Sequence, residues 1–296
     1  MKKHATLSLG LGVFDGLHRG HHLFLDKTNA LLTFSPHPDI VLQKNTDLRI
    51  LTTVEELRHL SRTHVHRIPF TRAMTQWDPY FFLDHCILTI LRPQKLVVGY
   101  DFRFGVNQSG TLDTLATWTK NNGIDLEILP AYPNDAHPIK SSAIRNALKN
   151  RDLDKAVEWL GHPYLMIGRI QKGDGRGREL GFPTANLLCP PRKLIPSTGV
   201  YGGWASVGQA LPTPAMMYVG KAPTFLGKTQ RVEIHLLEKK GHWYNQKMKV
   251  WFGTAIREER LFDSIPDLVR QLHRDKQAVL SWIQEHPGFL PRKNSL

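Results

Sequence analysis

Residues 9–21 have the sequence Leu-Gly-Leu-Gly-Val-Phe-Asp-Gly-Leu-His-Arg-Gly-His, and this stretch decides how the first half of the chain folds. The apolar residues 7–11 predict a buried strand, and the glycines that follow stand where this strand turns into a helix. Glycine lets the backbone approach a ligand closely, and a helix start offers N–H groups to phosphate. The stretch therefore predicts a phosphate-binding turn.

The rest of the first half alternates short apolar runs with helical patterns. Thr53 and Glu56 form a capping box, Asp78-Pro79 is a helix start, and Gly123 ends a helix. Alternation of strands and helices predicts an α/β domain with a parallel, doubly wound sheet. We expect strands at 7–11, 31–34, 96–99 and 126–129, and helices at 53–61, 78–91 and 111–122.

The second half has a different pattern, in which short strands are separated by turns. Two short helices near 142–149 and 153–160 form the junction, and an amphipathic helix near 266–284 closes the chain. This pattern predicts a small β-barrel with a covering helix. We expect strands at 165–170, 200–207, 215–219, 231–238 and 247–255, and domains at 1–157 and 158–296.

The composition excludes several classes of protein. Of the 296 residues, 41% are hydrophobic and 22% are charged, which excludes a disordered or low-complexity chain. No apolar run is long enough to cross a membrane, and the first residues lack a signal-peptide cleavage site. The two cysteines, Cys86 and Cys189, match no metal-site spacing and fit a reduced cytoplasm. The net charge of +13 favours polyanionic partners, among them nucleotide phosphates, nucleic acid and anionic membranes.

His18 and His21 are three residues apart and share one face of the predicted helix start. Two imidazoles beside a phosphate site can donate hydrogen bonds to the charge that develops during group transfer. We therefore predict that both are catalytic. A zinc site that uses His18, His21 and His22 is disfavoured, because the sequence has no second cluster of ligands.

A second glycine-rich stretch lies at 173–186, with the sequence Gly-Asp-Gly-Arg-Gly-Arg-Glu-Leu-Gly-Phe-Pro-Thr-Ala-Asn. Backbone N–H groups of such a loop can surround a phosphate, and Thr184 and Asn186 offer the hard oxygen ligands that Mg²⁺ prefers. The residues predicted to bind the nucleotide here are Gly173, Gly175, Arg176, Gly177 and Gly181.

The first half resembles the HIGH-type nucleotidyltransferases, which have a Rossmann-like fold, and specifically the bifunctional riboflavin kinase/FAD synthetases. Residues 12–21 match the family signature, and 34–38, 98–105 and 141–145 match later segments. The resemblance implies that Arg145 is catalytic beside His18 and His21. It also implies nucleotide binding by Gly12, Phe14, Asp15, Gly16, Ser141 and Ser142, and flavin binding by His37, Asp101 and Phe104.

The second half resembles the riboflavin kinase part of the same family. Residues 173–186 are similar to its signature, and 199–201, 220–225, 232–235 and Arg257-x-Glu259 match its later blocks in order. The resemblance implies that Glu233 is the general base and that Arg257 binds the flavin. It covers about residues 9 to 280.

The resemblance implies an enzyme with ATP as a substrate of both reactions. Riboflavin would be phosphorylated to FMN in the barrel with Mg²⁺, and FMN would be adenylylated to FAD in the first domain with release of pyrophosphate. An alcohol is a poor nucleophile at neutral pH and needs a base, whereas the phosphate of FMN is already anionic. The candidate base Glu233 lies in the kinase half, and no obvious acidic base lies in the first half, which agrees with this difference between the two nucleophiles.

Two other hypotheses remain. One is a riboflavin kinase alone, with an inactive first domain, because the segment 22–33 between the histidines and the second strand is short. The other is a basic nucleic-acid-binding protein, since residues 140–178 contain nine Lys/Arg against four Asp/Glu. The basic residues lie in glycine loops and helix starts rather than among aromatic platforms. We therefore expect riboflavin, FMN and ATP as partners, and neither nucleic acid nor membrane.

Overall fold

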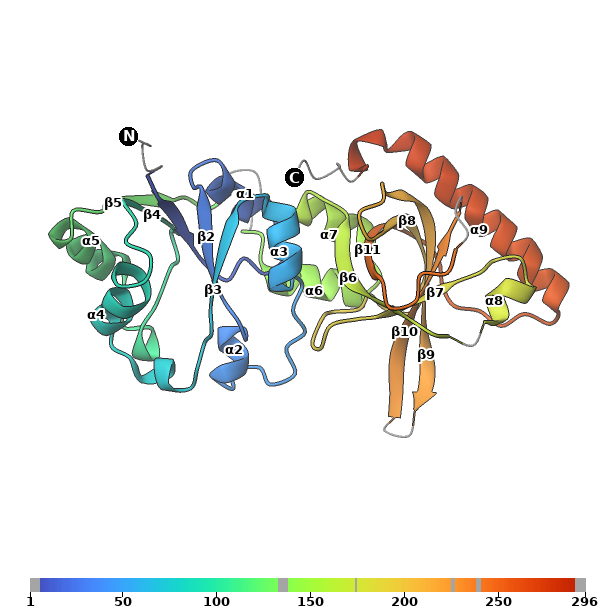
Figure 1. Ribbon diagram of the computed structural model, residues 1–296, viewed down its shortest axis with the longest axis horizontal. Coiled ribbons are helices and arrows are strands. Elements are labelled where there is room, and N and C mark those ends of the chain that lie inside the picture. Colours follow the sequence, from blue (N-terminus) through green and yellow to red (C-terminus); the bar gives the residue numbers. More distant parts are fainter. Residues whose placement is uncertain (1–5, 133–137, 174, 225–226, 238–240, 291–296) are drawn as a thin grey trace. The chain divides into compact units, whose positions relative to one another are not determined.

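The computed structural model describes residues 6–132, 138–173, 175–224, 227–237 and 241–290 (Figure 1). The chain forms two compact units, Met1–Lys140 and Ser141–Leu296. Helices α6 (Ser141–Lys149) and α7 (Leu153–Leu160) pack on each other, and α7 packs on two barrel strands. Along the chain, the boundary between the compact units follows Lys140, which is seventeen residues before the expected boundary at 157. The functional division at 157 stays a prediction.

The first unit contains a five-stranded parallel sheet in the order β3-β2-β1-β4-β5. The strand order reverses at β1, which confirms the predicted doubly wound arrangement. In such sheets ligands bind beyond the carboxyl ends of the strands at this reversal. The strands are β1 (Ser8–Leu11), β2 (Ala30–Phe34), β3 (His64–Ile68), β4 (Lys95–Gly99) and β5 (Asp125–Leu129).

The helices of this unit begin at the residues that the sequence marks. Thr53 and Glu56 form the expected capping box, and the Asp78 side chain accepts from two backbone N–H groups of the next turn. The helices are α1 (Arg19–Leu25), α2 (Pro38–Val41), α3 (Val54–Ser61), α4 (Pro79–Phe82) and α5 (Leu112–Asn121). The single helix expected at 78–91 is instead α4 followed by a wider π-helical turn, Leu83–Leu88.

The second unit is a closed antiparallel barrel in the order β10-β7-β6-β11-β8-β9, as the sequence predicts. Closure leaves no edge strand in the barrel. The short helix α8 (Arg176–Glu179) lies in the glycine-rich stretch. The strands are β6 (Tyr164–Gln171), β7 (Ala185–Leu188), β8 (Gly199–Val207), β9 (Thr213–Thr224), β10 (Gly227–Leu236) and β11 (Lys247–Arg257).

Helix α9 (Ile265–Glu285) lies along the outside of the barrel and is drawn in red in Figure 1. Two glycines permit this close packing. A Cβ at Gly202 would lie 2.9 Å from the side chain of Val279, and one at Gly253 would overlap the ring of Trp282. Val279 is fully buried, so the helix contributes directly to the core of the second unit.

Candidate functional sites

The loop that follows β1 has an unusual backbone that other residues hold in place. Phe14 has a φ of 54° and Gly16 a φ of 97°, both in the left-handed region. The Asp15 carboxylate accepts hydrogen bonds from the backbone N–H groups of Leu51 (2.8 Å) and Thr52 (2.9 Å). Asp15, predicted to bind nucleotide, therefore fixes the loop from within the protein.

His18 and His21 lie together at the start of α1, as predicted. Their rings are stacked, with centroids 3.7 Å apart and planes 19° apart. Burial lowers the pKa of His21 well below its ordinary value, and the neighbouring His18 and His22 lower it further. His21 is therefore neutral at pH 7. Its Nδ1 atom is buried and has no hydrogen-bond partner among the residues that the structure describes, so it can take a ligand.

Phe14 supports this histidine pair. The edge of its ring packs against His21 at a centroid distance of 5.4 Å, and its side chain is 1% exposed. A Cβ at Gly12 would lie 3.1 Å from the same ring, so glycine leaves the room that the ring occupies. The predicted nucleotide-binding role of both residues stays a prediction.

The predicted flavin-binding residues of the first unit lie in different surroundings. His37 caps α2, where its Nδ1 accepts from the backbone N–H of Asp39. Asp101 is exposed and close to Gly99. Phe104 belongs to the hydrophobic core, where it packs against Phe102. Phe104 thus stabilises this region, and flavin binding by all three stays a prediction.

Ser141, Ser142 and Arg145 lie in the first two turns of α6, which belongs to the second compact unit. The predicted grip of these residues on a triphosphate beside His21 stays a prediction.

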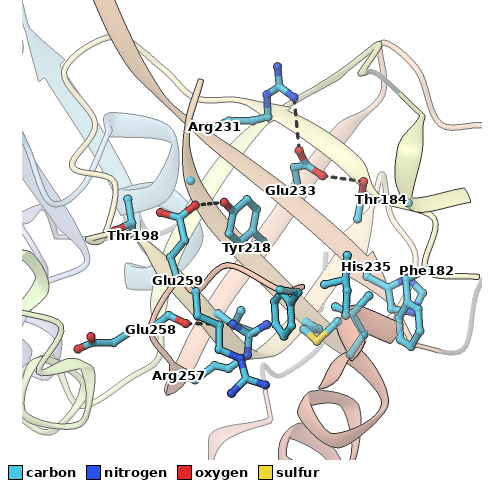
Figure 2. A pocket seen from close by; sticks show the side chains of 18 of the residues that line it. Phe182, Thr184, Thr198, Tyr218, Arg231, Glu233, His235, Arg257, Glu258 and Glu259 are labelled. Atoms are coloured by element: carbon cyan, nitrogen blue, oxygen red, sulfur yellow. Dashed lines mark hydrogen bonds and ion pairs between the residues drawn. The ribbon is translucent and has the colours of Figure 1, made fainter. Parts of the chain in front are cut away.

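The second unit has a cavity of about 1450 Å³ at one side of the barrel (Figure 2). It brings together most of the residues predicted for this half, although they come from the glycine-rich stretch, β7, β10 and β11. The predicted residues that line it are Gly175, Gly177, Thr184, Asn186, Glu233 and Arg257.

Glu233 lies in the middle of the polar wall. Its Oε2 accepts a hydrogen bond of 2.9 Å from Thr184 Oγ1, and its Oε1 lies 3.6 Å from Nη1 of Arg231 (Figure 2). Antiparallel pairing places Glu233 directly opposite Asn186, which is 6% exposed. The carboxylate, the hydroxyl and the amide therefore meet at one place.

The glycine-rich stretch turns tightly beside these groups. Gly175 has a φ of 77° and precedes α8. A Cβ at Gly177 would overlap the carbonyl oxygen of Phe182, and one at Gly173 would lie 2.7 Å from Cγ of Asn186. The loop thus packs its backbone against β7 without side chains. The side chain of Arg176 and the residue Asp174 lie outside the described part of the structure.

Known proteins resemble the chain along most of its length. A family model described as riboflavin kinase matches residues 160–283, and one described as FAD synthetase matches residues 1–143. The bifunctional riboflavin kinase/FMN adenylyltransferase of Bacillus subtilis is 30% identical, with 95% of this chain and 94% of that protein covered. The protein with the same name from Escherichia coli K12 is 32% identical, with 90% of each covered.

The chain belongs to this bifunctional family. A crystal structure from Streptococcus pneumoniae, described as a macrolide-efflux protein, has the same fold, with a TM-score of 0.81, 27% identity and coverage of 94% and 95%. The predictions of the fold, of a transferase that converts riboflavin to FMN and FMN to FAD, and of ATP as its substrate are confirmed. Among the described residues, no helix is long and apolar enough to span a bilayer.

Sequence reasoning missed several residues of the barrel cavity. Tyr218 lies opposite Glu233 in the β9–β10 pairing and donates a short hydrogen bond to Glu259. Burial raises the pKa of Tyr218, and the nearby charges of Glu259 and Glu233 raise it further, so its phenol stays a donor. Glu259 could have been found from the sequence, because it belongs to the matched block Arg257-x-Glu259. A further wall comes from Lys149–Arg151, which lies outside both family models.

His235 is another buried group of the cavity. Burial lowers its pKa, and the charge of Lys276 lowers it further, so its ring is neutral at pH 7. Its Nδ1 lies 2.9 Å from the carbonyl oxygen of Pro183, which can only accept, so Nδ1 carries the proton. This bond fixes the chain immediately before Thr184.

Proposed function

We propose that the barrel cavity is the site where riboflavin is phosphorylated, and that the loop 12–21 with the start of α1 is the site where FMN is adenylylated. The observation that carries the proposal is the position of Glu233. A carboxylate in hydrogen-bond contact with Thr184 and opposite Asn186, in a large cavity beside a glycine loop, has the groups that phosphoryl transfer to an alcohol requires.

In this proposal Glu233 removes the proton from the primary hydroxyl of riboflavin. Proton removal by a positioned carboxylate makes the alcohol a competent nucleophile toward the γ-phosphate of ATP. The hydrogen bond from Thr184 and the charge of Arg231 hold the carboxylate in one orientation.

The groups beside Glu233 also fit Mg²⁺. The hydroxyl of Thr184 and the amide oxygen of Asn186 are hard oxygen ligands on neighbouring parts of the chain. Mg²⁺ in kinases is held by few protein oxygens together with substrate phosphates. When bound, Mg²⁺ would neutralise the phosphate charge.

Adenylylation requires alignment and charge stabilisation but no base, because the attacking FMN phosphate is already anionic. We infer that His18 and the neutral His21 donate hydrogen bonds to the α-phosphate of ATP. Asp15 keeps the preceding loop in its left-handed conformation and so sets the position of the histidines. Ser141, Ser142 and Arg145 are proposed to bind the remaining phosphates.

We also propose a cytoplasmic location and no nucleic-acid partner. Neither Cys86 nor Cys189 forms a disulfide. The basic residues Lys149 and Arg151 line the kinase cavity, where the charge can attract the ATP phosphates.

The test is incubation of the whole protein with riboflavin, ATP and Mg²⁺, followed by separation of the flavins. We expect both FMN and FAD, with FMN formed first. Omission of Mg²⁺, with a chelator present, should stop FMN formation. Formation of FMN alone would identify a riboflavin kinase with an inactive first unit, and formation of neither would reject both site assignments.

A further inference from the structure

Four consecutive charged residues begin at Arg257, the last residue of β11, and each binds a partner on another part of the second unit. Glu258 pairs with Arg151 at 3.0 Å, and Glu259 accepts from Tyr218 of β9. Arg260 bonds Gln271 of α9. Arg257, the first of the four, binds Asp275 of α9. We call residues 257–260 the rim segment, because all four line the cavity.

Asp275 is the most buried member of this arrangement, with 1% of its side chain exposed. Nε of Arg257 lies 3.0 Å from Oδ1 and 2.9 Å from Oδ2, and Nη2 lies 2.8 Å from Oδ2. Gln271 donates a hydrogen bond of 2.6 Å to Oδ1 of the same carboxylate. The guanidinium is thus held along one edge in the planar geometry that carboxylates favour.

The contacts of Arg257 leave donors free for a ligand. A guanidinium has five N–H donors. Asp275 takes the one on Nε and one on Nη2, and the carbonyl of Glu258 takes one on Nη1 at 3.0 Å. Among the described residues, one N–H on each terminal nitrogen has no acceptor. The guanidinium also lies over the ring of Phe262, 5.5 Å from its centroid, which fixes its plane.

We propose that Asp275 is a positioning residue of the kinase reaction, which orients Arg257 so that its remaining N–H donors face an acceptor oxygen of the bound flavin. The inference rests on the proposed kinase site and on the predicted flavin contact of Arg257. Asp275 acts through Arg257 and does not touch the substrate. Gln271 supports Asp275: its amide N–H₂ donates to the Asp275 carboxylate, and its amide oxygen accepts from Arg260.

A purely structural ion pair between β11 and α9 would behave differently. It would change the fraction of folded protein, and so the apparent kcat, while each folded molecule kept its KM for riboflavin. A positioning role changes KM in folded protein, because the misdirected guanidinium no longer matches the flavin. The two roles are therefore separated by the split between KM and kcat and by a double-mutant cycle with Arg257.

The test uses the whole protein with Asp275→Asn, Arg257→Ala and the double variant. Asparagine keeps the size of the side chain but turns an N–H₂ group toward the guanidinium. We expect Asp275→Asn to raise the riboflavin KM about 10-fold, the usual worth of a charge-assisted hydrogen bond. In a protein that already carries Arg257→Ala, Asp275→Asn should cause no further rise in the riboflavin KM. Glu285→Gln, an equal change of charge at the exposed end of α9, is the matched control and should leave KM unchanged.

The proposal is overturned if Asp275→Asn has a riboflavin KM within twofold of the wild type. It is also overturned if the KM of the double variant rises by the product of the two single effects, because the residues would then act independently. If Asp275→Asn does not fold, Gln271→Ala decides: a severalfold rise in KM at unchanged thermal stability supports the proposal, and an unchanged KM rejects it. Failure of the wild type to make FMN is a separate outcome, which rejects the proposed kinase site itself.

Discussion

The two candidate sites differ in what holds their functional groups. In the first unit, the loop 12–21 is fixed by left-handed backbone and by Asp15, and its buried His21 is uncharged. In the barrel, the cavity is lined by charged side chains, most of which are tied to a charged or polar partner, such as Glu233 to Arg231 and Arg257 to Asp275. In our proposal, the sheet positions a backbone for phosphate, whereas the barrel positions charges for proton transfer.

This difference follows from the two nucleophiles. A riboflavin hydroxyl must lose a proton, so the kinase site needs a carboxylate whose orientation is fixed. The phosphate of FMN needs only alignment with the α-phosphate, and neutral donors serve this without a large desolvation cost. The comparison predicts that single substitutions separate the two activities cleanly.

The largest effect is expected for Glu233→Gln. Glutamine keeps the hydrogen bond from Thr184 but cannot accept a proton at neutral pH. FMN formation should fall by about 10²–10⁴, the usual worth of a general base. FAD formation from supplied FMN should continue at the normal rate. The measurement is a pair of initial rates on one preparation.

The control for this experiment is Glu258→Gln, since that carboxylate also lines the cavity but is 87% exposed and pairs with Arg151. It should leave FMN formation within severalfold of the wild type. Near-normal FMN formation by Glu233→Gln would assign Glu233 a structural role in its strand.

The next effect is expected for His21→Ala. Removal of one preorganised donor should lower FAD formation by about 10²–10³. FMN formation should be unchanged, because His21 belongs to the other unit. Rates with riboflavin and with FMN as substrates, compared with His59→Ala on α3 as the control, test this. Equal loss of both activities would point to a folding defect and would contradict the assignment of the two activities to separate sites.

A third prediction concerns where the kinase part begins. A fragment of residues 141–296 should fold and make FMN but no FAD. A fragment of residues 158–296 should make FMN too, but its free energy of unfolding should be lower by about 2–5 kcal/mol, because it lacks the buried Leu153, Ala156 and Val157 of α7. Chemical denaturation of both fragments measures the difference. Equal stabilities would place the boundary at 157, as the sequence predicts.

The smallest effect concerns pH. The pKa of His21 is lowered in the folded protein, so below about pH 6.5 the unfolded chain binds more protons than the folded one. Its contribution to stability is complete above that pH and is lost as the pH falls toward the lowered value, by at most about 1.4 kcal/mol per pH unit. Urea midpoints of the wild type and His21→Gln at pH 7.5 and 5.5 test this. The wild type should lose more stability on acidification, and parallel losses would contradict a lowered pKa.

Both architectures could be predicted from the sequence, but two strands could not. β3 contains His64, His66 and Arg67, so its one buried valine gives no apolar run. It is an edge strand of the sheet, and packing against β2 overrides its composition. β7 is short and begins within the glycine-rich stretch 173–186, whose glycines dominate the local pattern.

In the barrel cavity, sequence motifs pointed to Thr184, Asn186, Glu233 and Arg257, which line it together, but not to the groups that contact them. Asp275 is four residues from Val279, on the apolar face of α9, where a charge needs a partner. This spacing could have identified Asp275 as a buried carboxylate with a charged partner. The contacts of the rim segment depend on barrel closure, which brings distant elements together and leaves no local pattern.

The open sheet has two outer strands, β3 and β5, whereas the closed barrel has none. Both are guarded by charge. β3 exposes His64 and Arg67, and β5 exposes Asp125 and pairs Glu127 with Lys95 at 2.6 Å. A strand from a second molecule would have to bury these charges in order to extend the sheet.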